Sequence, residues 1–198
     1  MDVTRLADLD KVEIIQNHTP KGFGANHNAV FRRCTESFFC VLNPDVELIE
    51  NPFPTLLKAL NDESIALAAP LIIAPDGSVE DSVRFYPTFA SLLFKAFGSS
   101  DGRFAVKFNE PIQYPDWVAG MFMLFRSSVF KSLNGFDEGY FLYYEDVDIC
   151  RRAWLHRMRI AVLPEVVAIH DARRDSRRSL RHMRWHLASM VYFLWRWR

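Results

Sequence analysis

The chain has 198 residues, of which 49% are hydrophobic and 24% are charged, so its composition is that of one globular domain and excludes disordered and low-complexity classes. Its longest apolar stretches, residues 65–75 and 187–195, are too short for a transmembrane helix, which needs about 20 residues. No apolar signal-peptide core follows Met1, and the three cysteines have no metal-binding or redox spacing. We therefore expect a cytoplasmic protein.

The net charge of zero conceals an uneven distribution of charge. Residues 151–198 contain 12 arginines and 3 acidic residues, whereas residues 1–150 contain 12 basic and 21 acidic residues. An arginine-rich segment on an acidic body predicts an anionic partner. Nucleic acid, phosphate groups and a membrane surface are the candidates, and the lack of a recognised RNA-binding motif argues against nucleic acid.

Strand-like and helix-like segments alternate along the chain. We expect strands at residues 12–16, 37–42, 65–73, 117–126, 160–163 and 166–170, and a hairpin return at 79–82. Helices are expected at residues 25–35, 54–61, 88–97, 145–156 and 179–197. This alternation predicts an α/β fold with a mostly parallel sheet flanked by helices, and ligands then bind at the carboxyl ends of the strands.

The last expected helix is amphipathic. Six apolar residues fall on one side of it: Leu180, Met183, Leu187, Met190, Val191 and Leu194. With its arginines and tryptophans, this helix fits a membrane surface, but the same apolar side could pack on the domain or on a second subunit. A solvated arginine face is the simplest interpretation.

Acidic residues lie at two places where they could take part in chemistry, one after an expected strand and one at the start of an expected helix. Asn43-Pro44-Asp45 follows an apolar strand, where a carboxylate suits Mg²⁺ but the same tripeptide is also a common turn. Glu145 and Asp146 open a helix after an aromatic run that includes Phe141, Tyr143 and Tyr144. Acids there either stabilise the helix N-terminus or supply a general base whose pKa is raised by apolar neighbours.

Other candidates are single residues. His170 ends an apolar strand, where a histidine is either structural or a ligand for the metal at Asp45. Gly22 and Gly24 flank Phe23 in a loop before a helix, and such loops either approach phosphate or are ordinary turns.

In their order along the chain, these segments resemble family 2 glycosyltransferases with a GT-A fold. The matching blocks are N-x-x-x-x-G-F-G-A-N-x-N (17–28), V-L-N-P-D-V (41–46), D-W-V-A-G-M-F-M-L-F-R (116–126), G-F-D-E-G-Y-F-L-Y-Y-E-D-V-D-I-C-R-R (135–152), P-E-x-x-A-I-H (164–170) and R-W-H-L-A-S (184–189). The resemblance is greatest to bacterial rhamnosyltransferases of O-antigen and cell-wall assembly. It implies an inverting transfer of rhamnose from dTDP-L-rhamnose to a lipid-linked saccharide, at the inner face of the cell membrane. A homo-oligomer is the alternative partner for the apolar side of the last helix.

The resemblance also assigns roles to individual residues. It implies Asp146, within the Glu145–Asp146 pair, as the catalytic base and Asp45 and His170 as ligands of Mg²⁺ or Mn²⁺. The remaining implied roles are donor binding by Gly22, Asn26, Asn28 and Asn43, shaping of the acceptor pocket by Trp117 and Gly120, and support by Asp148 and Arg152.

The resemblance covers residues 12–195 but not the elements with which the family normally begins, two strands and a helix that hold the nucleotide. We expect a partial GT-A domain over residues 1–172, a basic amphipathic helix over 173–198, and an unpaired sheet edge that invites association. The alternative function is that of an inactive remnant or a peripheral membrane-binding module.

Overall fold

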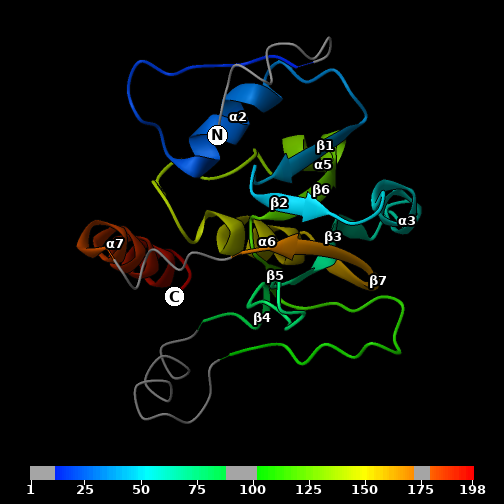
Figure 1. Ribbon diagram of the computed structural model, residues 1–198. Helices are drawn as coiled ribbons and strands as arrows, with labels where there is room; N and C mark the ends of the chain where they lie inside the picture. The colour runs from blue at the N-terminus through cyan, green and yellow to red at the C-terminus, as the bar shows by residue number, and fades with distance from the viewer. Residues whose placement is uncertain (1–11, 88–101, 172–178) are drawn as a thin grey trace.

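The computed structural model describes residues 12–87, 102–171 and 179–198. A central sheet of five strands runs through the molecule, with helices on both of its faces (Figure 1). The helix expected at residues 88–97 lies outside the described residues. No helix among the described residues is long and apolar enough to cross a membrane.

The five strands lie in the order β1 (Phe38–Leu42), β6 (Phe122–Arg126), β3 (Ile65–Ile73), β7 (Arg159–His170), β2 (Val46–Leu48). Strands β3 and β7 pair in parallel, and the other three pairings are antiparallel. The α/β fold expected from the sequence is confirmed. Its sheet is mixed, because β1, β3 and β7 run in one direction while β2 and β6 run in the other.

The sheet separates two apolar clusters, because successive side chains of a strand point to opposite faces. Along β6, Met123 and Phe125 belong to one cluster, and Phe122 and Leu124 to the other. The first face is covered by α5 (Ser127–Ser132) and α6 (Glu145–Leu155), and the second by α3 (Phe53–Ala59). Burial on both faces explains why β3 is a continuous apolar run.

Four of the expected strands differ from the structure. Residues 12–16 form no strand, and their apolar side chains are exposed because no neighbouring strand pairs with them among the described residues. The strand expected at 117–126 is divided at Gly120 into β5 (Trp117–Val118), which pairs with β4 (Val83–Arg84) in a separate sheet, and β6. The two strands expected at 160–163 and 166–170 form one strand, β7, with an irregular register beside Pro164.

The first helix among the described residues is α2 (Phe23–Phe31), and the last is α7 (Leu180–Arg196), which lies at the left-hand edge in Figure 1. Helix α7 confirms the expected helix at 179–197. The side of α7 that packs on the domain contains Ser189 and Phe193, whereas most of the apolar side predicted from the sequence is exposed.

Candidate active site

A cavity of about 510 Å³ lies where the start of α6 meets β5 and α7. Its walls are mostly apolar and aromatic, and two carboxyl groups, those of Glu145 and Asp146, are among them. The lining residues named below are Phe23, Asn43, Arg84, Tyr86, Trp117, Gly120, Tyr143, Tyr144, Glu145, Asp146, His186, Leu187 and Met190. A concave apolar site with a few polar groups is the usual form of a small-molecule site.

Asp146 lies in the wall of this cavity, in the first turn of α6. Its Oδ2 accepts a hydrogen bond from the backbone N–H of Gly120 at 3.0 Å, and its Oδ1 accepts one from the N–H of Val147 at 2.8 Å. Burial raises the pKa of Asp146, and these two donors oppose that rise because they stabilise the carboxylate.

Glu145 lines the same cavity but is 4% exposed, and its Oε2 has no hydrogen-bond partner among the described residues. Burial, and next the negative charge of Asp146, raise the pKa of Glu145 to about 8. The two adjacent carboxyl groups therefore differ in character. Burial raises the pKa of both groups, and backbone N–H donors oppose the rise in both. Only Glu145 also has the charge of a neighbouring carboxylate among the causes that raise its pKa, and this favours its protonated form at neutral pH.

The backbone before these acids is unusual. Tyr143 and Tyr144 have φ values of 71° and 70°, in the left-handed region that is unfavourable for residues other than glycine. Both tyrosines line the cavity, as the aromatic run in the sequence suggested. Phe141, from the same run, packs on Trp185 of α7 instead, with ring centroids 4.8 Å apart. Strained backbone of this kind gathers at functional sites.

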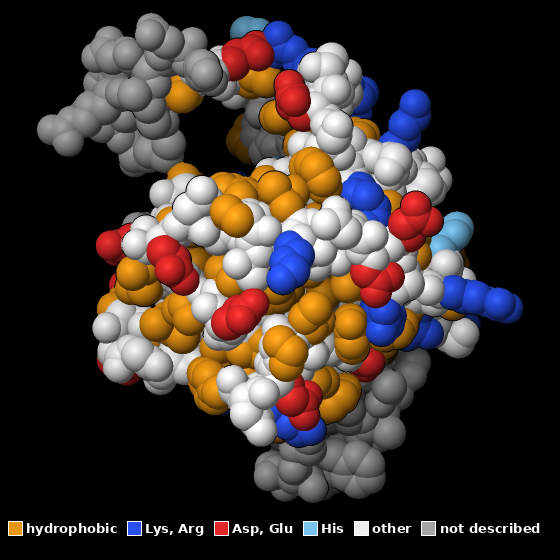
Figure 2. Space-filling view, turned by 90° about the vertical axis from the view of Figure 1, so that its right-hand side faces the viewer, with side chains coloured by type: hydrophobic (Ala, Val, Ile, Leu, Met, Phe, Trp, Pro, Cys, Tyr) orange, Lys and Arg blue, Asp and Glu red, His pale blue; other side chains and the backbone are white. Residues whose placement is uncertain are grey.

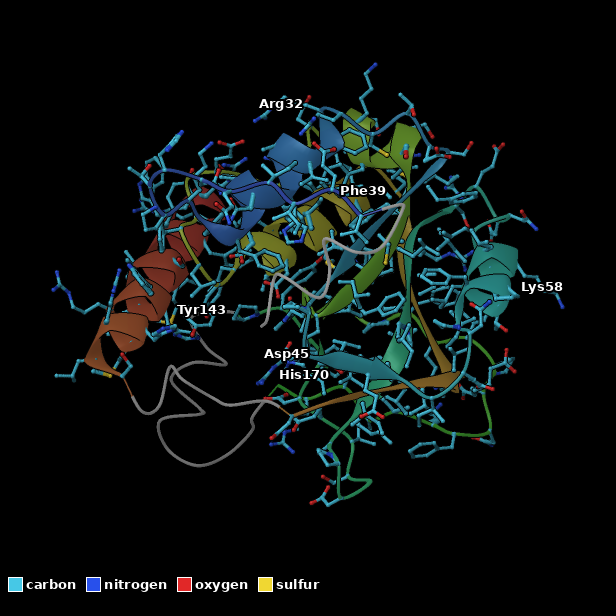
Figure 3. The ribbon with its side chains drawn as sticks, turned by 45° about the horizontal axis from the view of Figure 1, so that its top comes forward. Arg32, Phe39, Asp45, Lys58, Tyr143 and His170 are labelled. Carbon is cyan, nitrogen blue, oxygen red and sulfur yellow. The ribbon has the colours of Figure 1, made fainter. Side chains whose placement is uncertain are left out.

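Asp45 and His170 lie side by side at one end of β2 and β7 (Figure 3). The cause is strand register, because Val46 pairs with His170 and places the preceding residue next to the imidazole. The Oδ1 of Asp45 is 3.4 Å from the Nε2 of His170, and the buried Nδ1 of His170 has no partner among the described residues. Neither residue lines the cavity, but Asn43, two residues before Asp45, does.

The separation of this carboxylate and imidazole suits them as two neighbouring ligands of one divalent cation. Ligand atoms that each lie about 2.1 Å from Mg²⁺ are roughly 3 Å from each other. The two side chains provide only part of a coordination shell. In the parts of the chain that the structure describes, no three His, Cys, Asp or Glu side chains are grouped to hold a metal. The remaining ligands would be water or phosphate oxygens, as is usual for Mg²⁺.

Trp117 and Gly120 line the cavity together with Asp146. The indole N–H of Trp117 donates to the carbonyl of Phe85 at 3.0 Å, which fixes the ring in the wall. A Cβ on Gly120 would lie 3.2 Å from the ring of Phe23, so this position favours glycine where the backbone approaches both the ring and Asp146. The structure thus brings these two sequence candidates to the base candidate.

Gly22, Asn26 and Asn28 do not line this cavity. A Cβ on Gly22 would lie 2.6 Å from the carbonyl oxygen of Phe141, so Gly22 permits close packing of two loops. The buried Asn28 side chain accepts from the N–H of Phe136 at 2.9 Å and donates to its carbonyl at 2.8 Å. Asn26 accepts from Asn17 near the surface. Donor binding by these three residues stays a prediction, and the structure gives Gly22 and Asn28 a packing role.

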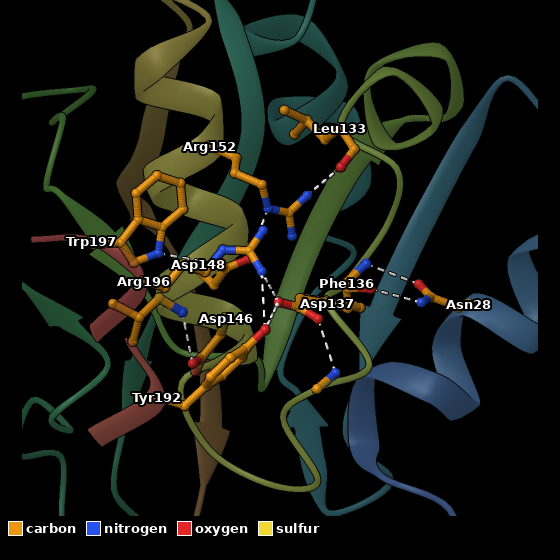
Figure 4. A network of polar contacts seen from close by, with 12 residues as sticks. Asn28, Leu133, Phe136, Asp137, Asp146, Asp148, Arg152, Tyr192, Arg196 and Trp197 are labelled. Carbon is orange, nitrogen blue, oxygen red and sulfur yellow. Dashed lines mark hydrogen bonds and ion pairs between the residues drawn. The ribbon is translucent and has the colours of Figure 1, made fainter. Parts of the chain in front are cut away.

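Asp148 and Arg152 do not line the cavity and belong to a polar network that joins α6 to α7 (Figure 4). Asp148 is fully buried and accepts from the Nε of Arg152 at 2.7 Å and from the indole N–H of Trp197 at 3.0 Å. Arg196 contacts Asp148 and also pairs with Asp137. The C-terminal turn of α7 is thereby attached to the helix that carries Asp146.

The sequence did not indicate Arg84, Tyr86, His186 and Met190 as cavity residues. They come from β4, the segment after it and α7, which approach α6 only through tertiary contacts. The basic–aromatic composition of α7 was visible in the sequence, but no spacing linked it to the acids of α6.

The mixed sheet between two layers of helices has the fold of GT-A glycosyltransferases. The candidate acids lie at the start of α6 and after β1. The crystal structure of GalNAc-T7 with UDP, GalNAc and Mn²⁺ has the same fold, with a TM-score of 0.63 and 15% identity over 82% of this chain and 32% of that chain. Residues 3–132 match the model of Glycosyl transferase family 2, and residues 102–177 match the model described as N-terminal domain of galactosyltransferase. The chain belongs to glycosyl transferase family 2.

Two similar proteins are named as rhamnosyltransferases. Rhamnosyltransferase WbbL of Escherichia coli K12 is 32% identical over 87% of this chain and 70% of its own length. N-acetylglucosaminyl-diphospho-decaprenol L-rhamnosyltransferase of Mycobacterium tuberculosis is 33% identical over 80% of this chain and 55% of its own length. The chain thus spans 55% to 70% of the length of these two relatives.

Proposed function

We propose that this protein transfers a sugar, L-rhamnose from dTDP-L-rhamnose, to a saccharide on a lipid diphosphate at the inner face of the cell membrane, in bacterial polysaccharide synthesis. The observation that carries the proposal is one cavity in which a buried carboxylate, Asp146, lies beside Trp117 and Gly120. The names of the two rhamnosyltransferase relatives support the choice of sugar, and the mycobacterial name supports a lipid-diphosphate acceptor.

Asp146 is the proposed base. An acceptor hydroxyl attacks the anomeric carbon of the donor and passes its proton to a carboxylate oxygen of Asp146. The new C–O bond forms as the bond from the anomeric carbon to the phosphate oxygen breaks, and the nucleoside diphosphate leaves with the electron pair. One displacement of this kind inverts the anomeric centre. A positioned base typically contributes 10²–10⁴-fold to the rate.

Glu145 is proposed to remain protonated beside the base. A second negative charge next to Asp146 would raise the pKa of the base and hold its proton after transfer. The dry position of Glu145 avoids that charge at neutral pH. The pair therefore carries a single negative charge at the point where the acceptor proton arrives.

Asp45 and His170 are the proposed holders of Mg²⁺ or Mn²⁺, and the presence of Mn²⁺ with UDP in the GalNAc-T7 crystal structure supports a metal of this class. Such a cation, when bound, supplies positive charge that stabilises the leaving diphosphate. Asn43 follows β1 and reaches the cavity wall, so the donor would extend from the Asp45–His170 pair toward Asp146.

The test is a transfer assay with purified protein, dTDP-L-rhamnose and Mg²⁺ or Mn²⁺. The acceptor is N-acetylglucosamine attached to a lipid through a diphosphate. We expect a product heavier by one deoxyhexose, formed by the wild type and lost when the cation is chelated. Asp146→Asn should reduce the rate by about 10²-fold or more, because the amide cannot accept the proton. Glu165→Gln makes the same chemical change at an exposed site on β7 and should leave the rate unchanged. Equal activity of the two variants would refute the assigned base.

A further inference from the structure

Helix α7 packs on the domain through its polar and aromatic side. The hydroxyl of Ser189 donates to the carbonyl of Leu142 at 2.8 Å, and the Oη of Tyr143 is 3.0 Å from the Nδ1 of His182. Phe193 is 1% exposed and packs against Tyr144, with ring centroids 5.4 Å apart. These contacts fix which side of α7 faces outward.

The outward side of α7 is an apolar stripe. We define the α7 stripe as Leu180, Met183, Leu187, Val191 and Trp195, which are 76%, 43%, 48%, 61% and 60% exposed. Their spacings of three and four residues place them on one side of the helix. Exposed apolar side chains gathered in this way mark a docking surface rather than ordinary scatter.

The charge around the α7 stripe is positive. Residues 179–198 contain four arginines and no acidic residue, and Arg181 and Arg184 lie exposed along the stripe. The face around α3 differs, because there acidic, basic and apolar side chains are interspersed (Figure 2). A second copy of the helix would bring arginines against arginines in a two-fold interface, whereas an anionic lipid surface complements them.

The α7 stripe is continuous with the cavity. Leu187 belongs to both, and its neighbours His186 and Met190 also line the cavity. A partner that covers the stripe therefore contacts a residue of the cavity that Asp146 also lines.

We propose that the α7 stripe inserts into an anionic lipid bilayer, so that the cavity opens at the membrane surface and the lipid-linked part of the acceptor enters past Leu187. The choice of acceptor rests on the proposed function, but the surface itself does not. Leu180, Val191 and Trp195 lie among the acyl chains just below the head groups, and Arg181 and Arg184 contact the phosphates.

The test is co-sedimentation with vesicles of phosphatidylcholine alone and of phosphatidylcholine with phosphatidylglycerol, without donor or acceptor. We expect binding to the anionic vesicles that weakens with salt. Leu180→Asp with Val191→Asp should weaken it by about tenfold or more, because both charges would enter the apolar layer. Arg181→Gln with Arg184→Gln should weaken it by roughly fivefold for each arginine.

The matched control is Asn61→Asp with Asn109→Asp, which adds the same charge at exposed sites outside α7 and should retain nearly all binding. Unchanged binding of the Leu180→Asp, Val191→Asp variant would overturn the proposal. So would a wild-type dimer in analytical ultracentrifugation that this variant dissociates, because the stripe would then be covered by a second copy.

A second measurement avoids dependence on the folding of a variant. Wild-type protein bound to vesicles with brominated acyl chains should lose tryptophan fluorescence, and Trp195→Phe should remove part of that quenching. Absence of quenching would contradict insertion. Vesicle binding without transferase activity would refute the proposed function alone, and activity on a short soluble acceptor without vesicle binding would refute this inference alone.

Discussion

Asn26 and Asn28 lie two residues apart on α2, yet their side chains have different surroundings. Asn28 is buried and bonds both backbone groups of Phe136, a residue 108 positions away, whereas Asn26 bonds Asn17 near the surface. We expect Asn28→Ala to lower the free energy of unfolding by about 2–4 kcal/mol, because two buried backbone groups lose their partner.

Chemical denaturation measures this difference, with Asn26→Ala as the matched control. The control should change stability by about 0.5 kcal/mol or less, since its bond is exposed. Equal effects of the two substitutions would show that Asn28 does not hold the loop before α6 in place.

The buried carboxyl of Glu145 predicts a particular dependence of stability on pH. Its pKa is raised to about 8 in the folded protein from an ordinary value near 4.5, so between these values the folded state holds a proton that the unfolded state has released. Glu145 therefore makes the free energy of unfolding fall as pH rises through this window, by at most about 1.4 kcal/mol per pH unit.

Glu145→Gln should remove this contribution, so the variant gains stability relative to the wild type from about pH 5 to pH 8. Denaturation at several pH values measures the difference. If the stability of the variant relative to the wild type stays constant over this range, or falls as pH rises, Glu145 is not protonated in the folded protein.

Helix α7 shows how far an element can be predicted from its own sequence. Its position in the chain was evident from the spacing of apolar residues, and the positions of α6 and of the continuous apolar strand β3 were also predicted. Its orientation was not, because Ser189, His182 and Phe193 gain partners in the segment before α6 that only the tertiary fold provides.

Other elements depended on distant partners in the same way. Residues 12–16 have a strand-like pattern but no described strand to pair with, and the apolar run 117–126 divides where Gly120 meets Phe23 and Asp146. Among the candidate site residues, local sequence identified the acids of α6, whereas the packing of Asn28 and the cavity wall from β4 required the fold.

The attachment of α7 to α6 can be tested by a substitution at the end of α7. Trp197→Phe removes the indole donor from the buried Asp148, and we expect it to lower stability by about 1.5–3 kcal/mol and to speed hydrogen exchange along α7. Trp195→Phe is the control, because that ring is 60% exposed on the outward side. If the two substitutions have the same effect, Asp148 does not hold α7.

In the whole molecule, the proposed cation site and the proposed base belong to different elements that Asn43 links through the cavity wall. This arrangement predicts that nucleotide binding depends on a divalent cation at Asp45 and His170. We expect His170→Gln to weaken Mn²⁺-dependent binding of dTDP by about tenfold or more in calorimetry.

His156→Gln is the control for that substitution, because His156 is exposed at the end of α6. Wild-type protein that binds dTDP equally well with and without the cation would argue against a metal role for His170. Complete lack of dTDP binding by wild-type protein would instead favour a binding module that does not use the donor. That outcome would agree with β1, which pairs only with β6 among the described residues.

Asp146 is the proposed acceptor of the proton from the attacking hydroxyl, and the single-turnover rate at saturating donor and acceptor measures this role. Asp146→Asn should bind dTDP as the wild type does yet turn over about 10²-fold more slowly or worse, since only the chemical step loses a group. A rate within about threefold of the wild type, with dTDP affinity unchanged, would show that Asp146 is not the base.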